Sequence, residues 1–313
     1  MKAKILVTGG AGFIGSHITE KLVALGYDVV VIDNLSTGNI KNLEHIVDNI
    51  KFIEGDILDL ELIKKISKVD YIFHEAALPS VQRSIKDPKT TIEVNVNGTL
   101  NVLLAARDNK VKKVIFASSS SIYGDRNGKC KKEIMKPMPL SPYAISKVTG
   151  EYLCKVFSHV YGLPTVCLRY FNVFGPRQNP DSEYSAVIPK FIKLILQNKQ
   201  PTIFGDGKQS RDFTYIDNVV YANILAMKSK MKNGETINIA CGESHNLLKL
   251  IELINKILDK NIRPIFTEAR PGEVKHSLAD ISKAKKLLGY KPLINFEEGL
   301  RRTINFYKKH LSF

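Results

Sequence analysis

Short apolar runs alternate with longer amphipathic stretches through the first half of this chain of 313 residues. Apolar runs of this length are typical of strands that are buried on both faces of a sheet. Alternation of such strands with helices predicts a parallel sheet covered on both sides. We therefore expect an α/β fold with a doubly wound parallel sheet, whose strands lie near residues 4–8, 28–33, 50–54, 70–74, 113–118 and 164–170.

Three glycines, Gly9, Gly12 and Gly15, separate the first apolar run from the amphipathic stretch that follows it. Glycines at this spacing let the chain turn tightly, let a pyrophosphate approach the backbone, and let helix and strand pack closely. The helix, expected from about Ser16 to Leu25, would present free N–H groups and a favourable dipole to the phosphates. The motif predicts a dinucleotide site.

Two acidic residues follow the next strands. Asp33 ends the second apolar run, where dinucleotide folds accept the hydroxyls of the adenosine ribose. A carboxylate there would repel a 2′-phosphate, so NAD is favoured over NADP. Asp56 follows the third run and is expected beside the adenine ring.

The regular alternation ends near residue 175, where loops, short strands and helices take over. A chain of this length can form two lobes. We expect residues 1–174 to form an NAD-binding Rossmann domain and residues 175–313 to form a smaller substrate-binding lobe. A segment near residues 213–240 is expected to cross back to the sheet.

Tyr143 and Lys147 are four positions apart, just after Pro142, which suits the start of a helix. Residues at this spacing share one helix face. A phenol with an ordinary pKa near 10 is a poor base at neutral pH, and we expect the ammonium to lower that pKa. The pair therefore predicts a base that takes a proton from a sugar or alcohol hydroxyl.

A run of serines, Ser118 to Ser121, ends the strand near residues 113–118. Hydroxyls at the carboxyl end of a parallel strand face the crevice where ligands bind in such sheets. One of these serines is expected to orient the substrate hydroxyl and pass its proton to Tyr143.

The charge pattern argues against nucleic acid as a partner. The formal net charge is +15, and a basic excess can indicate nucleic acid or an anionic membrane. The lysines are dispersed, however, in pairs such as Lys112–Lys113 and Lys131–Lys132, which we interpret as solvated faces. The chain contains neither an arginine-rich stripe nor aromatic residues interleaved with basic ones.

The four cysteines are scattered, without a Cys-x-x-Cys pair or a nearby histidine cluster. This distribution predicts a cytoplasmic protein without a structural metal site. The chain also has no apolar stretch long enough to predict a signal peptide or a membrane span.

The motifs together resemble the extended short-chain dehydrogenase/reductase family and, within it, the UDP-hexose 4-epimerases, most closely in pattern the UDP-N-acetylglucosamine 4-epimerases. The resemblance covers essentially the whole chain. The matching pieces are residues 8–15, 33–34, 56–57, 74–77, 95, 118–124, 141–147, 168–173, 205–207, 211–213 and 270–273.

The resemblance implies three sets of site residues. The catalytic residues would be Ser119, Tyr143 and Lys147. NAD would contact Gly9, Gly12, Phe13, Ile14, Gly15, Asp33, Asn34, Asp56, Ile57, Ala76, Ala77, Asn95, Ser118, Tyr143, Lys147 and Tyr170. The UDP-sugar would contact Ser80, Ser119, Ser120, Ser121, Tyr143, Asn172, Val187, Thr202, Phe204, Arg211, Arg270, Glu273 and Ser277.

The resemblance also implies roles for several substrate residues. Asn172 and Arg211 would hold the diphosphate, and Phe204 with the neighbouring backbone would take the uracil. Arg270 and Glu273 would contact the UDP phosphate and ribose. Arginines suit this role because their guanidinium groups give fixed, charge-assisted hydrogen bonds to phosphate oxygens.

The implied reaction oxidises and then re-reduces one sugar carbon, C4, so that its configuration is inverted without net redox change. Related 4,6-dehydratases carry an Asp–Glu pair at the positions of Ser120 and Ser121, and related decarboxylases carry a Glu at Ser121. This chain has only hydroxyls there, so it lacks the general acid–base group that elimination needs. The resemblance therefore favours an epimerase.

Ser277 matches the family position that limits the size of the sugar. A tyrosine there restricts the pocket to plain hexoses, whereas a small residue leaves room for a 2-acetamido group. We expect interconversion of UDP-GlcNAc and UDP-GalNAc. A UDP-glucose or UDP-glucuronate 4-epimerase would share the same catalytic residues, and a non-catalytic NAD-binding regulator or nucleic-acid binder is the alternative from another class.

The resemblance implies a homodimer, in which helices near 91–108 and 143–160 pair across a two-fold axis. Leu100, Leu103 and Leu104 would supply apolar surface for this contact, or would face the sheet instead.

Overall fold

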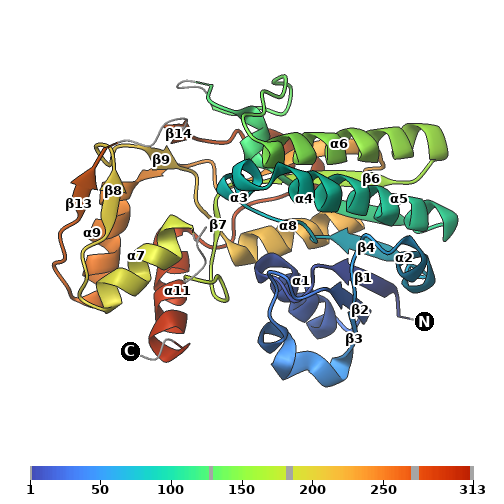
Figure 1. Cartoon of the computed structure of the whole chain (residues 1–313), viewed down its shortest axis with the longest axis horizontal. Coiled ribbons are helices and arrows are strands. Elements are labelled where there is room, and N and C mark those ends of the chain that lie inside the picture. The colour runs from blue at the N-terminus through green and yellow to red at the C-terminus, as the bar shows by residue number, and fades with distance from the viewer. Residues whose placement is uncertain (1, 127–129, 181–185, 269–274, 311–313) are drawn as a thin grey trace.

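A seven-stranded parallel sheet forms the centre of the molecule, in the order β11-β6-β5-β4-β1-β2-β3 (Figure 1). The computed structural model describes residues 2–126, 130–180, 186–268 and 275–310. The predicted doubly wound α/β fold is confirmed, because all neighbouring strands of this sheet pair in parallel. The strands are β1 (Lys4–Thr8), β2 (Asp28–Asp33), β3 (Ile50–Glu54), β4 (Tyr71–His74), β5 (Lys113–Ser119), β6 (Thr165–Tyr170) and β11 (Asn233–Ile239).

Helices cover both faces of the sheet, as alternating βα units require. One face packs against α1 (Phe13–Ala24), the 3-10 helix η1 (Ile40–Asn49) and α8 (Ile216–Lys228). The other packs against α2 (Leu60–Ile66), α5 (Gly98–Asp108) and α6 (Pro142–Tyr161). The central strands are buried on both sides, which explains their nearly continuous apolar sequence.

The short helices α3 (Val81–Lys86) and α4 (Pro88–Ile92) and a π-helical turn (Glu93–Asn97) lead from β4 into α5. Another 3-10 turn (Ser120–Tyr123) follows β5. The helix expected near 91–108 is therefore not one regular α-helix. Leu103 is fully buried in the core, with Leu100 and Leu104 packed against the same cluster, so these leucines face the body of the molecule.

The C-terminal part lies beside the carboxyl ends of the strands, at the left of Figure 1. Its larger helices are α7 (Val187–Leu196), α9 (Leu247–Leu258) and α11 (Phe296–His310), whereas the short α10 (Ser282–Leu288) packs against β11 and α8. Its small sheets pair β7 (Val173–Phe174) with β10 (Thr214–Tyr215), β8 (Thr202–Phe204) with β13 (Ile265–Thr267), and β9 (Ser210–Arg211) with both β12 (His245–Asn246) and β14 (His276–Ser277). Within the described residues, no helix has the length and apolar character needed to cross a bilayer.

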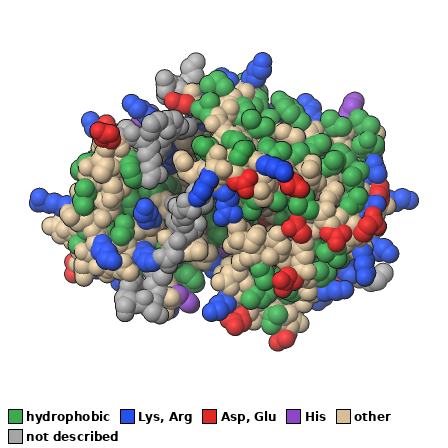
Figure 2. All heavy atoms as spheres, viewed as in Figure 1, with side chains coloured by type: hydrophobic (Ala, Val, Ile, Leu, Met, Phe, Trp, Pro, Cys, Tyr) green, Lys and Arg blue, Asp and Glu red, His purple; other side chains and the backbone are tan. Residues whose placement is uncertain are grey.

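Two of the paired lysines are buried, although we expected solvated faces. Lys113 is 6% exposed and its ammonium donates to the carbonyl oxygens of Ala226 and Ser229. Lys131 is 2% exposed and donates to the carbonyl oxygen of Arg126. The other basic side chains on the face shown in Figure 2 are dispersed among acidic and neutral ones.

Candidate active site

The glycine loop after β1 forms one wall of a deep cavity of about 260 Å³. Gly9 has a φ of +69°, and a Cβ on it would lie 2.6 Å from the amide nitrogen of Ala76. A Cβ on Gly15 would lie 2.1 Å from the carbonyl oxygen of Gly9. Only glycine fits at these two positions, and α1 begins immediately after the loop, at Phe13. This start is three residues earlier than expected, so the helix N-terminus lies closer to the cavity.

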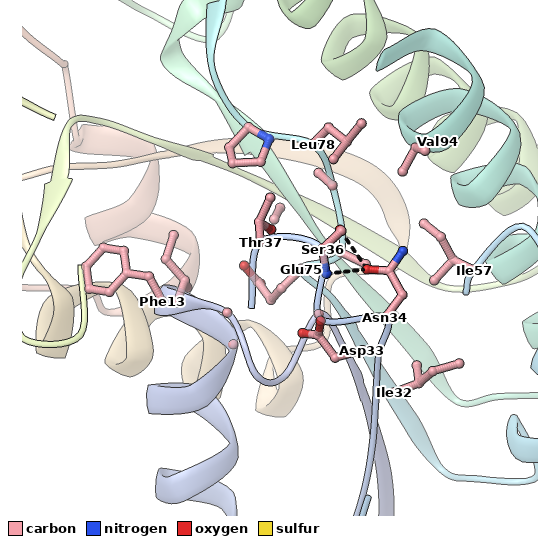
Figure 3. Close-up of a pocket in the computed structure, with 18 of the residues that line it drawn as sticks. Phe13, Ile32, Asp33, Asn34, Ser36, Thr37, Ile57, Glu75, Leu78 and Val94 are labelled. Carbon is pink, nitrogen blue, oxygen red and sulfur yellow. Dashed lines mark hydrogen bonds between the residues drawn. The ribbon is translucent and has the colours of Figure 1, made fainter. Parts of the chain in front are cut away.

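Asp33 braces this loop as well as lining the cavity. One carboxylate oxygen accepts from the Ala11 amide at 2.9 Å and the other from the Leu35 amide at 2.9 Å. Burial raises the pKa of Asp33, while these backbone hydrogen bonds lower it. Asn34 donates to Asp56 at 2.7 Å, which joins the segments that follow β2 and β3 at the same rim. The side-chain oxygen of Asn34 also accepts from the amide and the hydroxyl of Ser36 (Figure 3).

The predicted NAD residues converge on this cavity, with one exception. The lining includes Gly9, Gly12, Phe13, Ile14, Gly15, Asp33, Asn34, Asp56, Ile57, Ala76, Ala77, Ser118, Tyr143, Lys147 and Tyr170. Asn95 is not among the lining residues. Its side chain is 3% exposed and bonds both the amide and the carbonyl oxygen of Leu78, so it supports the cavity wall from behind.

Tyr143 and Lys147 lie in the first two turns of α6, as their spacing predicts. Ser141 caps this helix by accepting from the Ala144 amide, and Pro142 occupies its first turn. Tyr143 lines both the NAD cavity and the neighbouring cavity described below. Lys147 is 5% exposed, and its ammonium donates to the carbonyl oxygen of Ala117 at 2.8 Å.

The expectation that Lys147 lowers the pKa of Tyr143 is wrong for this structure. Burial raises the pKa of Tyr143, a hydrogen bond with Ser119 lowers it, and the carboxylate of Glu75 raises it further. Burial also lowers the pKa of Lys147 to about 8. Removal from water disfavours the charged form of each side chain, and it is the largest cause of the shift in both.

The serine run at the end of β5 is divided between two tasks. Ser118 donates to Glu151 at 2.5 Å, within the protein. Ser119 accepts from the amide of Ser121 at 3.1 Å and bonds Tyr143 through its side chain. The hydroxyl of Ser121 is buried without a hydrogen-bond partner among the described residues, so it is available to a ligand.

A buried network holds this run in place. Arg169 forms a two-pronged ion pair with Glu151, at 2.8 and 2.7 Å. Arg169 also donates to the hydroxyl of Tyr123 at 2.8 Å, and Tyr123 donates to Asn238 at 2.7 Å. The network links α6, β6 and β11 to Ser118 at the start of the serine run and to Tyr123, two residues beyond its end.

A second cavity, of about 570 Å³, lies between the sheet and the C-terminal part. The predicted substrate residues that line it are Ser80, Ser119, Ser120, Ser121, Tyr143, Asn172, Arg211 and Ser277. Val187, Thr202 and Phe204 do not line it; Val187 begins α7, and the other two lie in β8. Arg270 and Glu273 lie outside the described residues.

Two of these lining residues have strained backbones. The φ angles of Ser80 and Asn172 are +98° and +37°. Such conformations cost free energy in residues other than glycine and cluster at functional sites. Neither the sequence motifs nor any hydrophobic pattern could have indicated them.

Three charged residues that line these cavities were missed by the sequence analysis. Glu75 lines the NAD cavity, and Lys131 and Lys190 line the second one. Glu75 belongs to the quoted segment 74–77, so an ionisable side chain directly after a strand, followed by two alanines, was the available signal. Lys131 and Lys190 carry no motif of their own.

A Rossmann sheet, a glycine cradle, and a Ser–Tyr–Lys group where two cavities meet define a dinucleotide-dependent enzyme that acts on a hydroxyl group. Comparison with known proteins agrees: residues 5–240 match the NAD dependent epimerase/dehydratase family. The chain belongs to this family. The inferred resemblance and the expected cofactor, NAD, are thereby confirmed.

Three solved structures illustrate the similarity. A UDP-N-acetylglucosamine 4-epimerase from Methanobrevibacter ruminantium, in complex with UDP-N-acetylmuramic acid, is 43% identical, with a TM-score of 0.95 over 99% of this chain and 100% of its own. A Thermotoga maritima UDP-glucose 4-epimerase with UDP-glucose is 39% identical, with a TM-score of 0.94 over 99% and 100%. A Bacillus cereus UDP-glucuronic acid 4-epimerase with UDP-glucuronic acid and NAD is 39% identical, with a TM-score of 0.90 over 98% and 99%.

Proposed function

We propose that this enzyme interconverts UDP-GlcNAc and UDP-GalNAc by inverting C4 of the sugar. The observation that carries the choice of sugar is the position of Ser277. It lines the second cavity, is 9% exposed, and pairs with Arg211 in the parallel register of β14 and β9. A small side chain here leaves space beside the residue expected to hold the diphosphate.

The relatives support this choice without deciding it. The structure at 43% identity is a UDP-N-acetylglucosamine 4-epimerase with a still larger acetamido sugar derivative bound. The similar structures with UDP-glucose and UDP-glucuronic acid keep those two sugars as the alternatives. They would be favoured if the cavity beside Ser277 rejected an acetamido group.

In the proposed mechanism, Tyr143 takes the proton of the C4 hydroxyl, and Ser119, hydrogen-bonded to Tyr143, orients that hydroxyl. NAD, when bound, would supply a reversible hydride acceptor, and the positive charge of its oxidised ring would favour the phenolate of Tyr143. Lys147 holds the end of β5 through Ala117 and lies on the same helix face as Tyr143. The second cavity, of about 570 Å³, would give the sugar room to turn and present its other face.

The residues present fit NAD. The glycine loop admits a pyrophosphate beside an N-terminal helix turn without an acidic residue. Gly9, Gly12 and Gly15 would hold the pyrophosphate, Asp33 the adenosine ribose, and Asp56 the adenine. We propose that residues 1–174 with the returning segment supply this site and that residues 175–313 supply most UDP contacts.

We also propose that the enzyme is a cytoplasmic homodimer. All four cysteines are free, as in a reducing compartment. The outer face of α6 exposes an apolar stripe of Tyr152, Val156 and Val160, which are 56%, 48% and 62% exposed. Exposed apolar stripes of this kind mark protein interfaces.

A panel of UDP-sugars, assayed with purified protein without added NAD, tests the substrate. We expect the enzyme to equilibrate UDP-GlcNAc with UDP-GalNAc. Chromatographic separation and quantification of the two UDP-sugars measures this. Turnover of UDP-glucose or UDP-glucuronate alone would replace the acetamido proposal with that alternative. No turnover of any UDP-sugar by folded, NAD-containing protein would refute the epimerase.

A further inference from the structure

Glu75 places a carboxylate in the NAD cavity, at the end formed by Tyr143, Lys147 and Tyr170. It follows β4 directly, and its amide donates to the carbonyl oxygen of Thr8 at 3.1 Å. Its side chain is only partly buried, because it faces the cavity (Figure 3). The proposed mechanism uses no carboxylate here.

The orientation of the Glu75 carboxylate is fixed by a chain of hydrogen bonds from α8. The hydroxyl of Tyr170 donates to Glu75 at 2.9 Å. The amide group of Asn223 donates to the same hydroxyl at 2.8 Å and to the carbonyl oxygen of Val219 at 2.9 Å. Asn223 is fully buried, so the acceptor in the cavity is held from behind.

The charged and titratable groups that face Glu75 come from two elements. They are Lys147 and Tyr143 from α6 and Tyr170 from β6. Burial raises the pKa of Glu75 to about 7, while the Tyr170 hydrogen bond and Lys147 lower it. The carboxylate therefore changes charge within the physiological range.

We propose that the Glu75 carboxylate sets the redox preference of the bound dinucleotide, favouring the oxidised over the reduced form. The ring must meet the carbon whose hydroxyl Tyr143 serves, so it would lie at this end of the cavity. Gaining a hydride cancels the positive charge of the ring. A nearby fixed anion, poorly screened by water, therefore stabilises the oxidised ring selectively.

This preference has a use in a reaction without net redox change. The hydride must return to the sugar in every cycle, and enzyme left in the reduced form after losing a keto sugar is inactive. A carboxylate that favours the oxidised form lowers the fraction of enzyme that holds the reduced form together with a keto sugar, and so lowers the chance that the keto sugar is lost. The inference rests on the proposed Tyr143 chemistry for the position of the ring, but not on which sugar is turned over.

The test compares Glu75→Gln, which removes the charge and keeps the shape, with Glu75→Asp, which keeps the charge. Each purified protein is incubated with equal NAD+ and NADH, freed of unbound nucleotide and denatured, and both released forms are quantified. We expect Glu75→Gln to raise the bound NADH:NAD+ ratio about tenfold, which is about 30 mV for a two-electron couple. The Asp variant and an exposed control, Glu54→Gln, should stay within about twofold of wild type.

A pH series separates charge from packing. The wild-type NADH:NAD+ ratio should fall as the pH rises through about 7, because Glu75 ionises there. Below about pH 8, where Lys147 still keeps its proton, the ratio in the Gln variant should stay nearly constant. An unchanged ratio in Glu75→Gln, or an equal change in Glu75→Asp, overturns the proposal. Because no sugar is present, these outcomes are independent of the UDP-sugar panel, and thermal unfolding verifies that each variant is folded.

Discussion

The ammonium of Lys147 donates to the carbonyl oxygen of Ala117 at 2.8 Å and lies 5.9 Å from the centroid of the Tyr143 ring. The lysine thus joins α6 to the end of β5, next to the serine run. Within the part of the chain that the structure describes, this buried ammonium forms no salt bridge, and burial lowers its pKa to about 8. A charge kept in this position for catalysis should destabilise the fold.

Lys147→Met should increase the free energy of unfolding below about pH 8. Removing the buried charge should contribute roughly 3 kcal/mol, and losing the hydrogen bond to Ala117 should cost about 1 kcal/mol, which leaves a net gain of about 2 kcal/mol. Between about pH 8 and the ordinary lysine value of 10.5, the unfolded chain holds the proton that the folded chain has released. Wild-type stability therefore rises relative to the variant across this window. Urea unfolding of cofactor-free protein measures the difference, and a difference that does not vary with pH would contradict the buried charge.

Tyr143→Phe should lower kcat by about 10²–10⁴-fold, because it removes the proposed base. NAD content and thermal stability should be close to wild type, since the ring remains. Tyr161→Phe is the matched control at the other end of α6, where the side chain is 50% exposed. A Tyr143→Phe enzyme with more than a tenth of wild-type kcat would assign the base to another residue.

The sequence predicted the local structure correctly at positions where the backbone conformation permits only one residue type. Gly9 and Gly15 fit only as glycine, so the dinucleotide loop was predictable, and the apolar runs predicted six strands of the sheet. The pattern could not reveal how burial changes ionisation. Tyr143 and Lys147 were expected to act on each other, whereas removal from water dominates both pKa values.

Contacts between segments that are far apart in the sequence also could not be predicted from the pattern of residues. Lys131 resembles a surface lysine, yet it is covered because its backbone pairs with Ala279, nearly 150 positions away. Leu103 would suit either an interface or the core, and only the packing of α5 against α2 and α6 decides for the core. Asn95 was expected to contact NAD because it matches a family motif, but its side chain supports the cavity wall instead of lining it.

Glu151→Gln should destabilise the protein by about 3–5 kcal/mol, because it leaves the Arg169 guanidinium buried without a counter-charge. The two side chains are 5% and 4% exposed. Ser118 also loses a charged acceptor, so NAD affinity should fall. The control is Glu298→Gln, whose pair with Arg302 is exposed and should contribute less than about 1 kcal/mol. Equal losses in the free energy of unfolding for the two substitutions would show that the buried pair stabilises the fold no more than the exposed pair does.

Val156→Lys should convert the proposed dimer into a monomer, because it places a charge in the middle of the exposed stripe on α6. Sedimentation or light scattering measures the mass of the assembly. Val47→Lys, at a 43% exposed position of η1 on the opposite side of the sheet, is the matched control. A wild-type protein that is monomeric at micromolar concentration, or a dimer unaffected by the lysine, would remove this face from the proposal.

Ser277→Tyr should close the space beside Arg211 and exclude the acetamido sugars selectively. The backbone of Ser277 accepts from the Asp212 amide at 2.7 Å, so β14 cannot move away without breaking its pairing with β9. We expect kcat/KM for UDP-GlcNAc to fall at least about 100-fold, and that for UDP-glucose, where it is turned over, to change by less than about fivefold. Ser282→Tyr, at an exposed position five residues further along the chain, controls for an added ring. Equal losses on both sugars would mean that Ser277 supports the strand without selecting the substrate.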